Sequence, residues 1–189
     1  MAADAYSIGQ LVTDLEQISA RFNNDHDIIA AVRPLARRAA LARDSWFSEH
    51  MYQTDAVQGY GVHMLHEKAD HTLAVFAVSW LPNRGAPPHN HGTWAVVVGV
   101  EGDERNTFYE RIDRGAQPGH AQLRRIGEKV FGIGEVVGMP TGVIHSVWND
   151  SDLVSVSLHI YGMHINHTER SQFDIEHELE TPFKVRIAA

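Results

Sequence analysis

The chain contains no cysteine among its 189 residues, and this absence excludes several kinds of chemistry at once. Without a thiol the protein can form no disulfide, no cysteine-ligated zinc site and no cysteine nucleophile. An excess of positive charge is also absent, because 16 Lys and Arg residues stand against 24 Asp and Glu residues. This balance argues against a partner that presents a phosphate backbone, so we expect no nucleic-acid partner.

Long hydrophobic runs are lacking as well. No stretch approaches the ~18 apolar residues that a membrane-spanning helix needs, so we expect no membrane partner. Residues 1–7 carry an early acid and no basic region, which is unlike a secretory signal. We therefore expect a cytoplasmic protein.

Histidine is what the sequence has in excess, with 13 residues. It is the commonest metal ligand and the side chain that titrates near neutrality. No run of histidines stands at either end of the sequence, so an affinity tag does not explain the number. The excess directs attention to metal binding and proton transfer.

Residues 1–45 have the apolar spacing of helices, and the chain from residue 60 onward has the pattern of short strands. Ser7 is a candidate N-cap for a first helix, and Asp25 or Asp27 for a second, which Pro34 is expected to kink or divide. Turn residues recur about every ten positions, which favours a sandwich or barrel over a parallel sheet. The expected strands are 71–80, 93–100, 105–113, 120–126, 128–131, 143–149, 153–161 and 183–187.

Two segments carry candidate metal ligands. His89 and His91 form an H-x-H pair, whose side chains would point to the same side of a strand. In the second segment, Pro140 and Gly142 predict a tight turn, after which His145 would enter the barrel opposite the pair. The alternative reading is that these are buried histidines satisfied by hydrogen bonds in the core.

The spacing of Gly134, Pro140, Gly142, His145 and Asn149 resembles the second conserved motif of the cupin superfamily. The resemblance implies a mainly β fold, a double-stranded β-helix or jelly-roll barrel with N-terminal helices. It also implies one cupin domain over 1–189, with a helical segment (1–45) packed on a barrel (60–189).

The first cupin motif is matched only in part. Many cupins carry a glutamate ligand shortly after the second histidine, where this chain has Trp94 and Ala95. The next acid, Glu101, lies too far along the expected strand. The expected site is therefore three neutral imidazoles, which leave a divalent ion its full charge and open positions. Imidazole ligands suit zinc, copper and nickel as well as iron. The assignment of Fe(II) as the metal therefore rests on the resemblance to a known family and not on the ligands.

A third pattern is the alternation along residues 155–162. Ser157, His159 and Tyr161 share one face of the expected strand, and apolar residues occupy the other. A buried row of polar groups is costly unless its members are hydrogen-bonded, so the row is either a supporting network or a catalytic one. With the cupin motifs, it resembles the Ser-His-Tyr relay of the cysteine dioxygenase type I family of thiol dioxygenases. The resemblance implies that the Tyr161 hydroxyl would hydrogen-bond the reacting oxygen or sulfur.

The chain departs from the animal cysteine dioxygenases at two points. It lacks the cysteine that crosslinks to the relay tyrosine, so Tyr161 stays unmodified. It also has Val62 where those enzymes place a carboxylate-binding arginine. Bacterial members similar to 3-mercaptopropionate dioxygenases instead carry an arginine nine residues after the tyrosine, which here is Arg170. A guanidinium can hold a carboxylate through two hydrogen bonds; alternatively, Arg170 pairs with a nearby acid on the surface.

The resemblance therefore predicts an Fe(II) thiol dioxygenase that converts a small carboxylated thiol and O2 into a sulfinate. A different thiol such as cysteine, a non-thiol cupin oxygenase and a non-catalytic metal-binding cupin remain as alternatives. The sequence leaves the identity of the thiol and the formation of a homo-oligomer open. It also leaves open whether His63, His164 and His167 line the substrate pocket.

Overall fold

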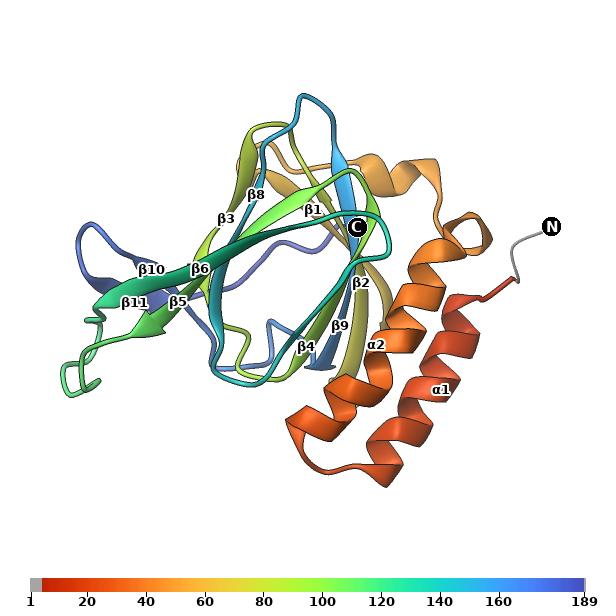
Figure 1. Ribbon diagram of the computed structural model, residues 1–189, viewed down its shortest axis with the longest axis horizontal. Helices are drawn as coiled ribbons and strands as arrows, with labels where there is room; N and C mark the ends of the chain where they lie inside the picture. Colours follow the sequence, from red (N-terminus) through yellow and green to blue (C-terminus); the bar gives the residue numbers. More distant parts are fainter. Residues whose placement is uncertain (1–4, 189) are drawn as a thin grey trace.

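The computed structural model describes residues 5–188, which form two antiparallel β-sheets and two helices (Figure 1). One sheet has the strand order β1-β2-β9-β4-β7 and the other β11-β10-β3-β8-β5-β6. The strands are β1 (Tyr60–Glu67), β2 (Thr72–Trp80), β3 (Arg84–His89), β4 (Ala95–Glu101), β5 (Glu104–Arg111), β6 (Leu123–Phe131), β7 (Val136–Met139), β8 (Ile144–Asn149), β9 (Ser155–Met163), β10 (Ser171–Asp174) and β11 (Leu179–Pro182).

The strand order is that of a jelly roll. Strands β2, β9, β4 and β7 face strands β3, β8, β5 and β6, and the chain passes repeatedly from one sheet to the other. A double-sheet jelly roll built from such crossovers is the double-stranded β-helix that the sequence predicts. The mainly β fold and its cupin-type barrel are thus confirmed.

The helices are α1 (Ile8–Arg21) and α2 (Asp25–Leu41), followed by the short 3-10 helices η1 (Arg43–Ser45) and η2 (Glu49–Tyr52). Ser7 caps α1 as predicted, in a capping box with Gln10. The second helix is present, but its predicted N-cap was wrong: Asn24, not Asp25 or Asp27, caps α2, and its side chain accepts a hydrogen bond from the Asp27 amide at 3.0 Å.

Pro34 does not divide α2, which is a single helix from Asp25 to Leu41. A proline inside a helix costs about 3 kcal/mol, because it removes one hydrogen bond and crowds the preceding turn. The buried face of α2 offsets this cost, since Ile29, Val32 and Ala36 pack into the core against the five-stranded sheet.

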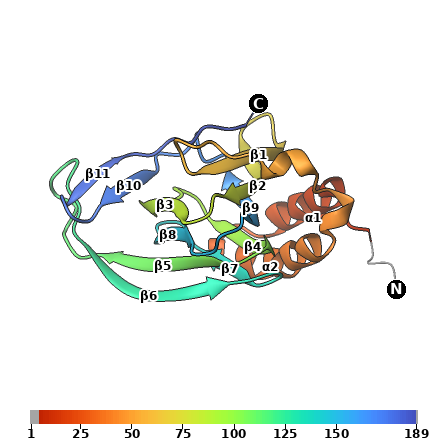
Figure 2. The same ribbon diagram turned by 90° about the horizontal axis from the view of Figure 1, so that it is seen from above.

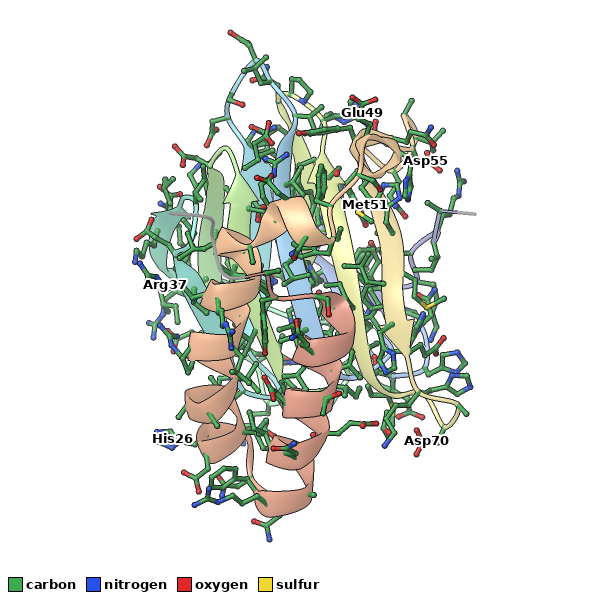
Figure 3. The ribbon with its side chains drawn as sticks, turned by 90° about the vertical axis from the view of Figure 1, so that its right-hand side faces the viewer. His26, Arg37, Glu49, Met51, Asp55 and Asp70 are labelled. Carbon is green, nitrogen blue, oxygen red and sulfur yellow. The ribbon has the colours of Figure 1, made fainter. Side chains whose placement is uncertain are left out.

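The two larger apolar cores divide the molecule into layers. One lies between the helices and the outer face of the five-stranded sheet, which α1 and α2 cover (Figure 3). The other fills the barrel between the two sheets, which Figure 2 shows from above. Strand β9 serves both cores, because Val156, Leu158 and Ile160 pack under the helices whereas Tyr161 belongs to the barrel core.

Several strand boundaries differ from the prediction. The two strands expected at 120–126 and 128–131 are one strand, β6, because a register shift opposite Phe108 and Tyr109 absorbs the irregularity near Gly127. No strand covers 183–187. That segment follows the β10–β11 hairpin, and its Phe183 and Val185 are buried in the barrel core.

No helix within residues 5–188 combines the length and the apolar character needed to cross a membrane.

Candidate metal centre

His89, His91 and His145 come together inside the barrel, with one ring nitrogen of each within 4.8 Å of the others. His89 ends β3 and lies directly opposite His145 on β8. His91 is not on a strand as predicted, because β3 ends at His89 and the chain turns through Gly92, whose φ is +66°. The three side chains nevertheless converge and are at most 5% exposed.

The orientation of two of these rings is set by hydrogen bonds from Nδ1. The Nδ1–H of His89 donates to the Pro87 carbonyl oxygen at 2.7 Å, and that of His145 to Asn106 Oδ1 at 2.8 Å. A carbonyl or amide oxygen can only accept, so each ring carries its proton on Nδ1. The Nε2 lone pairs of both rings are left for another ligand, the arrangement that supports metal-bound histidines.

The donor set fits a divalent transition metal. The Nε2 atoms of His91 and His145 are 3.2 Å apart. Two nitrogens that each lie about 2.1 Å from one ion would be separated by about 3.0–3.4 Å. Burial lowers the pKa of all three imidazoles, that of His145 to about 3, so they are neutral and able to ligate.

Glu101 does not join the three histidines, in agreement with the sequence. Its carboxylate accepts hydrogen bonds from Tyr52, at 2.7 Å, and from Arg43. The group of possible ligands found around these histidines in residues 5–188 contains no carboxylate. A bound divalent ion would therefore keep its charge and attract an anionic ligand.

The row on β9 is a continuous hydrogen-bonded chain. Ser157 Oγ lies 2.8 Å from His159 Nε2, and His159 Nδ1 lies 2.8 Å from the Tyr161 hydroxyl. The Trp80 indole donates to Ser157 Oγ at 3.1 Å. The Tyr161 ring packs edge-on against His91, with centroids 5.1 Å apart. The chain therefore ends beside the candidate metal ligands.

Arg170 is buried, not paired with an acid on the surface. Its side chain is 3% exposed, its Nε donates to the Phe183 carbonyl oxygen at 3.1 Å, and its guanidinium lies 4.2 Å from the Phe183 ring centroid. Among the described residues, no hydrogen-bond partner contacts its Nη2. Burial lowers the pKa of Arg170, which marks a charge in need of an anion.

These groups line one small cavity of about 30 Å³. Arg170, Tyr161 and three histidines (His89, His145 and His159) form its polar side, whereas its remaining wall is mainly apolar. The lining residues are Tyr60, Val62, Val78, Trp80, Ala86, His89, His145, Val147, His159, Tyr161, Ile165, Arg170, Phe183 and Val185.

His63, His164 and His167 are not among these lining residues. The His63 ring contacts the Gln53 carbonyl oxygen at 2.8 Å. His164 and His167 lie with Glu67 in a second group whose possible ligand atoms are within 4.8 Å of one another. His164 Nδ1 accepts the Asn166 amide at 3.1 Å, so its neutral ring carries its proton on Nε2 and has no free lone pair for a metal.

Sequence reasoning did not find Asn106, Trp80 or Phe183, which orient His145, Ser157 and Arg170 respectively. Each is distant in the sequence from the residue it supports, and none belongs to a local motif. Their contribution depends on the pairing of strands, which a single sequence does not display.

No model of a protein family matches the chain. Among solved structures it is similar to an oxalate oxidase bound to glycolate, with 18% identity and a TM-score of 0.46 over 62% of this chain and 59% of the other. A Thermus thermophilus protein matches with 15% identity and a TM-score of 0.47 over 61% and 92% of the two chains. Oxalate decarboxylase from Bacillus subtilis matches with 24% identity and a TM-score of 0.40 over 53% and 23%.

The strand order and the buried histidines define the class of this fold and site. The chain is a double-sheet jelly roll with a candidate three-histidine metal centre.

Proposed function

We propose that this chain is an Fe(II)-dependent thiol dioxygenase acting on a small carboxylated thiol such as 3-mercaptopropionate. One thiol and one O2 give one sulfinate and one proton, so that sulfur is oxidised and both oxygen atoms end on it. The observation that carries the proposal is the shared cavity, which Arg170 and Tyr161 line together with His89 and His145.

His89, His91 and His145 would hold the iron, because their neutral imidazoles converge and two have a fixed tautomer. A ferrous ion there would supply open coordination positions at which a thiolate and O2 can meet. Iron in place of zinc, copper or nickel is part of the proposal, since imidazoles suit all of these ions.

Arg170 would bind the substrate carboxylate. Its buried guanidinium has an Nη2 without a hydrogen-bond partner among the described residues, and a carboxylate accepts hydrogen bonds of the required geometry. Phe183 holds the guanidinium by its ring and its carbonyl oxygen, so the charge is already in position before the substrate arrives.

The composition of the cavity wall favours a thiol without an amino group. The residues that line it include no carboxylate, and Val62, which also lines it, cannot form an ion pair. The ammonium group of cysteine would therefore lose its hydration without gaining a counter-ion. This argument supports 3-mercaptopropionate over L-cysteine.

Tyr161 would act by position and hydrogen bonding, not as a nucleophile. Burial raises its pKa, so the hydroxyl keeps its proton near neutral pH. Its bond to His159 directs the hydroxyl, and its ring lies against His91, an arrangement that would bring the oxygen close to the reacting atoms. Preorganised groups of this kind stabilise charge that develops during reaction.

The test is metal analysis followed by oxygen consumption after anaerobic reconstitution with Fe(II). We expect O2 uptake with 3-mercaptopropionate, one sulfinate formed per O2, and both labelled atoms in the product from ¹⁸O2. Cysteamine, which lacks a carboxylate, and L-cysteine should react more slowly. An iron-loaded protein inert to all thiols, including mercaptosuccinate, would overturn the proposal.

The same buried cation and metal ligands would also suit a small carboxylate without sulfur. Oxalate, catechols and diketones therefore belong in the substrate panel. Turnover of one of these with no thiol oxidation would identify a non-thiol cupin oxygenase. Tight metal binding without turnover of any compound would identify a non-catalytic cupin.

A further inference from the structure

The side chains of the candidate metal centre are almost completely covered. His91 is 2% exposed, His145 is 1% exposed, and Arg170 and Tyr161 are each 3% exposed. A metal ion and a carboxylate must nevertheless reach these side chains if the site is to be used. Part of the cavity wall must therefore move aside to admit them.

Most of the cavity wall is fixed by strand pairing. Its lining residues on β1, β2, β3, β8 and β9 all lie within the hydrogen-bonded sheets. The lining residues between β9 and β10 lie on a loop that is tied to the metal centre, because Thr168 Oγ1 donates to the His91 carbonyl oxygen at 2.8 Å. The remaining lining residues, Phe183 and Val185, belong to the segment after β11.

We call residues 184–188 of this segment the strap. Figure 2 shows the strap as the last, dark blue part of the ribbon, running from β11 toward β1. Its side chains alternate, since Val185 and Ile187 pack on the barrel core whereas Lys184 and Arg186 are exposed. Val185 also lines the cavity, so displacement of the strap would open the cavity to solvent.

The strap is extended like a strand but has almost none of a strand's pairing. Within residues 5–188, its one hydrogen bond between backbone groups runs from the Ala188 amide to the Val62 carbonyl oxygen, at 2.7 Å. The side-chain amide of Asn166 takes the place of a neighbouring strand. Asn166 Nδ2 donates to the Val185 carbonyl oxygen at 2.8 Å, and Asn166 Oδ1 accepts the Val185 amide at 2.9 Å.

Gln58, in the loop before β1, holds the next residue of the strap in the same way. Its Oε1 accepts the Arg186 amide at 2.8 Å, and its Nε2 donates to the Arg186 carbonyl oxygen at 3.4 Å. The Arg186 guanidinium forms an ion pair with Asp55 at 2.9 Å. Water can replace such contacts at the surface, because the Arg186 side chain is 67% exposed.

Phe183 is the fixed end of the strap. Its amide donates to the Arg170 carbonyl oxygen at 3.0 Å, and its own carbonyl oxygen accepts the Arg170 Nε hydrogen at 3.1 Å. These two bonds and the ring contact hold Phe183 on Arg170. Motion of the strap therefore pivots after Phe183 and leaves the guanidinium in place.

We propose that the strap is a lid over the metal centre, held closed by Asn166 and Gln58, and that it opens to admit the metal ion and the substrate. Its opening unpairs no strand of either sheet. Segments that cover binding sites are drawn from the least stable parts of a fold. The inference rests on the proposed function for its effect on thiol turnover, whereas its effect on metal entry is independent of the substrate.

Hydrogen exchange tests whether the strap opens as one unit. Asn166→Ala leaves the acceptor of the Arg186 amide intact, and Gln58→Ala leaves that of the Val185 amide intact. We expect each variant to speed exchange of the amide that the other side chain holds by about 10–100-fold, since each variant loses two hydrogen bonds. Exchange in β2 should not change. Unchanged exchange in the strap, or equal acceleration in β2, would overturn the inference.

A crosslink across the strap tests whether its opening admits ligands. Gln58→Cys/Arg186→Cys places one thiol on the strap and one beside it, and the chain has no other cysteine. A short bifunctional methanethiosulfonate joins the two thiols, and a reductant releases them. Glu110→Cys/Arg124→Cys, at directly paired residues of β5 and β6, is the matched control.

The readout is the rate at which the full-length apoprotein takes up Co(II), followed by visible absorption. We expect the crosslinked strap to slow uptake by about tenfold or more, and the reductant to restore it. The control crosslink should have no effect. In iron-loaded protein, kcat/KM for 3-mercaptopropionate should fall in parallel. Equal Co(II) uptake with and without the strap crosslink would overturn the inference.

The lid and the proposed function fail separately in these experiments. If no thiol reacts but the crosslink slows Co(II) uptake, the proposed function is wrong and the strap remains the lid. If 3-mercaptopropionate turns over equally fast in the crosslinked, iron-loaded protein, the strap is not the route of entry and the proposed function stands.

Discussion

Phe183 holds Arg170 in two ways: its ring lies 4.2 Å from the guanidinium carbon, and its carbonyl oxygen accepts the Arg170 Nε hydrogen at 3.1 Å. The guanidinium is thus held by Phe183, and its Nη2 has no hydrogen-bond partner within residues 5–188. An arginine held in this way loses little side-chain freedom when it binds a carboxylate, which lowers the cost of binding.

Arg170→Ala should therefore raise the KM for 3-mercaptopropionate by about 10–100-fold, because a charged hydrogen bond contributes about 1.5–3 kcal/mol. Steady-state oxygen consumption measures the change. Arg124→Ala, which removes an exposed arginine on β6, is the matched control. A KM within twofold of the wild type would remove Arg170 as the carboxylate anchor.

Phe183→Leu should weaken substrate binding less than Arg170→Ala does, because the backbone carbonyl remains and only the ring contact is lost. A cation–π contact contributes about 0.5–2 kcal/mol, so we expect a rise in KM of roughly 2–30-fold. The same assay with iron content measured in parallel tests this. Loss of iron together with the rise in KM would show that Phe183 supports the histidines and not Arg170.

Asn106→Ala should reduce metal affinity by about 10–100-fold, because it removes the acceptor that holds His145 Nδ1–H. Competition with a chromogenic chelator measures the affinity. Asn23→Ala, at an exposed position between the helices, is the control. Equal affinities in Asn106→Ala and the wild type would mean that the tautomer of His145 needs no support from this amide.

Tyr161→Phe keeps the ring that packs on His91 and removes only the hydroxyl. We expect metal affinity to be unchanged and turnover to fall by about 10–100-fold, with less sulfinate formed per O2 consumed. Simultaneous recording of oxygen and sulfinate tests this. Wild-type turnover and coupling would exclude a role for the hydroxyl.

Glu104 should make the stability of the fold depend on pH. Its pKa is raised in the folded protein to about 7 from a usual value of 4.5, so the folded state binds more protons in this interval. The stabilisation is present below about pH 4.5 and is lost as pH rises through about 7, with a total of roughly 3 kcal/mol. In urea unfolding, the free energy of unfolding of Glu104→Gln should therefore rise relative to that of the wild type as pH increases. The exposed control Glu16→Gln should show no such change.

Much of this site was predictable because its motifs are local. Pro140 and Gly142 form the turn before β8, where the Val143 amide donates to the Pro140 carbonyl and Gly142 has a φ of +92°. The turn delivers His145 as the spacing predicts. The alternation of Ser157, His159 and Tyr161 likewise requires only the period of a strand.

Other features could not be predicted because they depend on contacts between distant segments. Glu104 reads as an ordinary charged residue at the end of a turn, and only the closure of the two sheets buries it beside Ser157. The alternation of side chains along a strand was used to predict that His89 and His91 converge. It is not the reason that they do, because β3 ends at His89 and His91 lies outside the strand. Tertiary packing decided both.

The two sheets divide the work of the site. His89 and His145 lie on neighbouring strands of one sheet, and Tyr161 lies on the other, so the distance between the Tyr161 hydroxyl and these candidate ligands depends on how closely the two layers pack. Metal binding and turnover can therefore be altered separately. A substitution in the barrel core that moves the sheets apart by a fraction of an ångström would leave a fully loaded protein that turns over slowly.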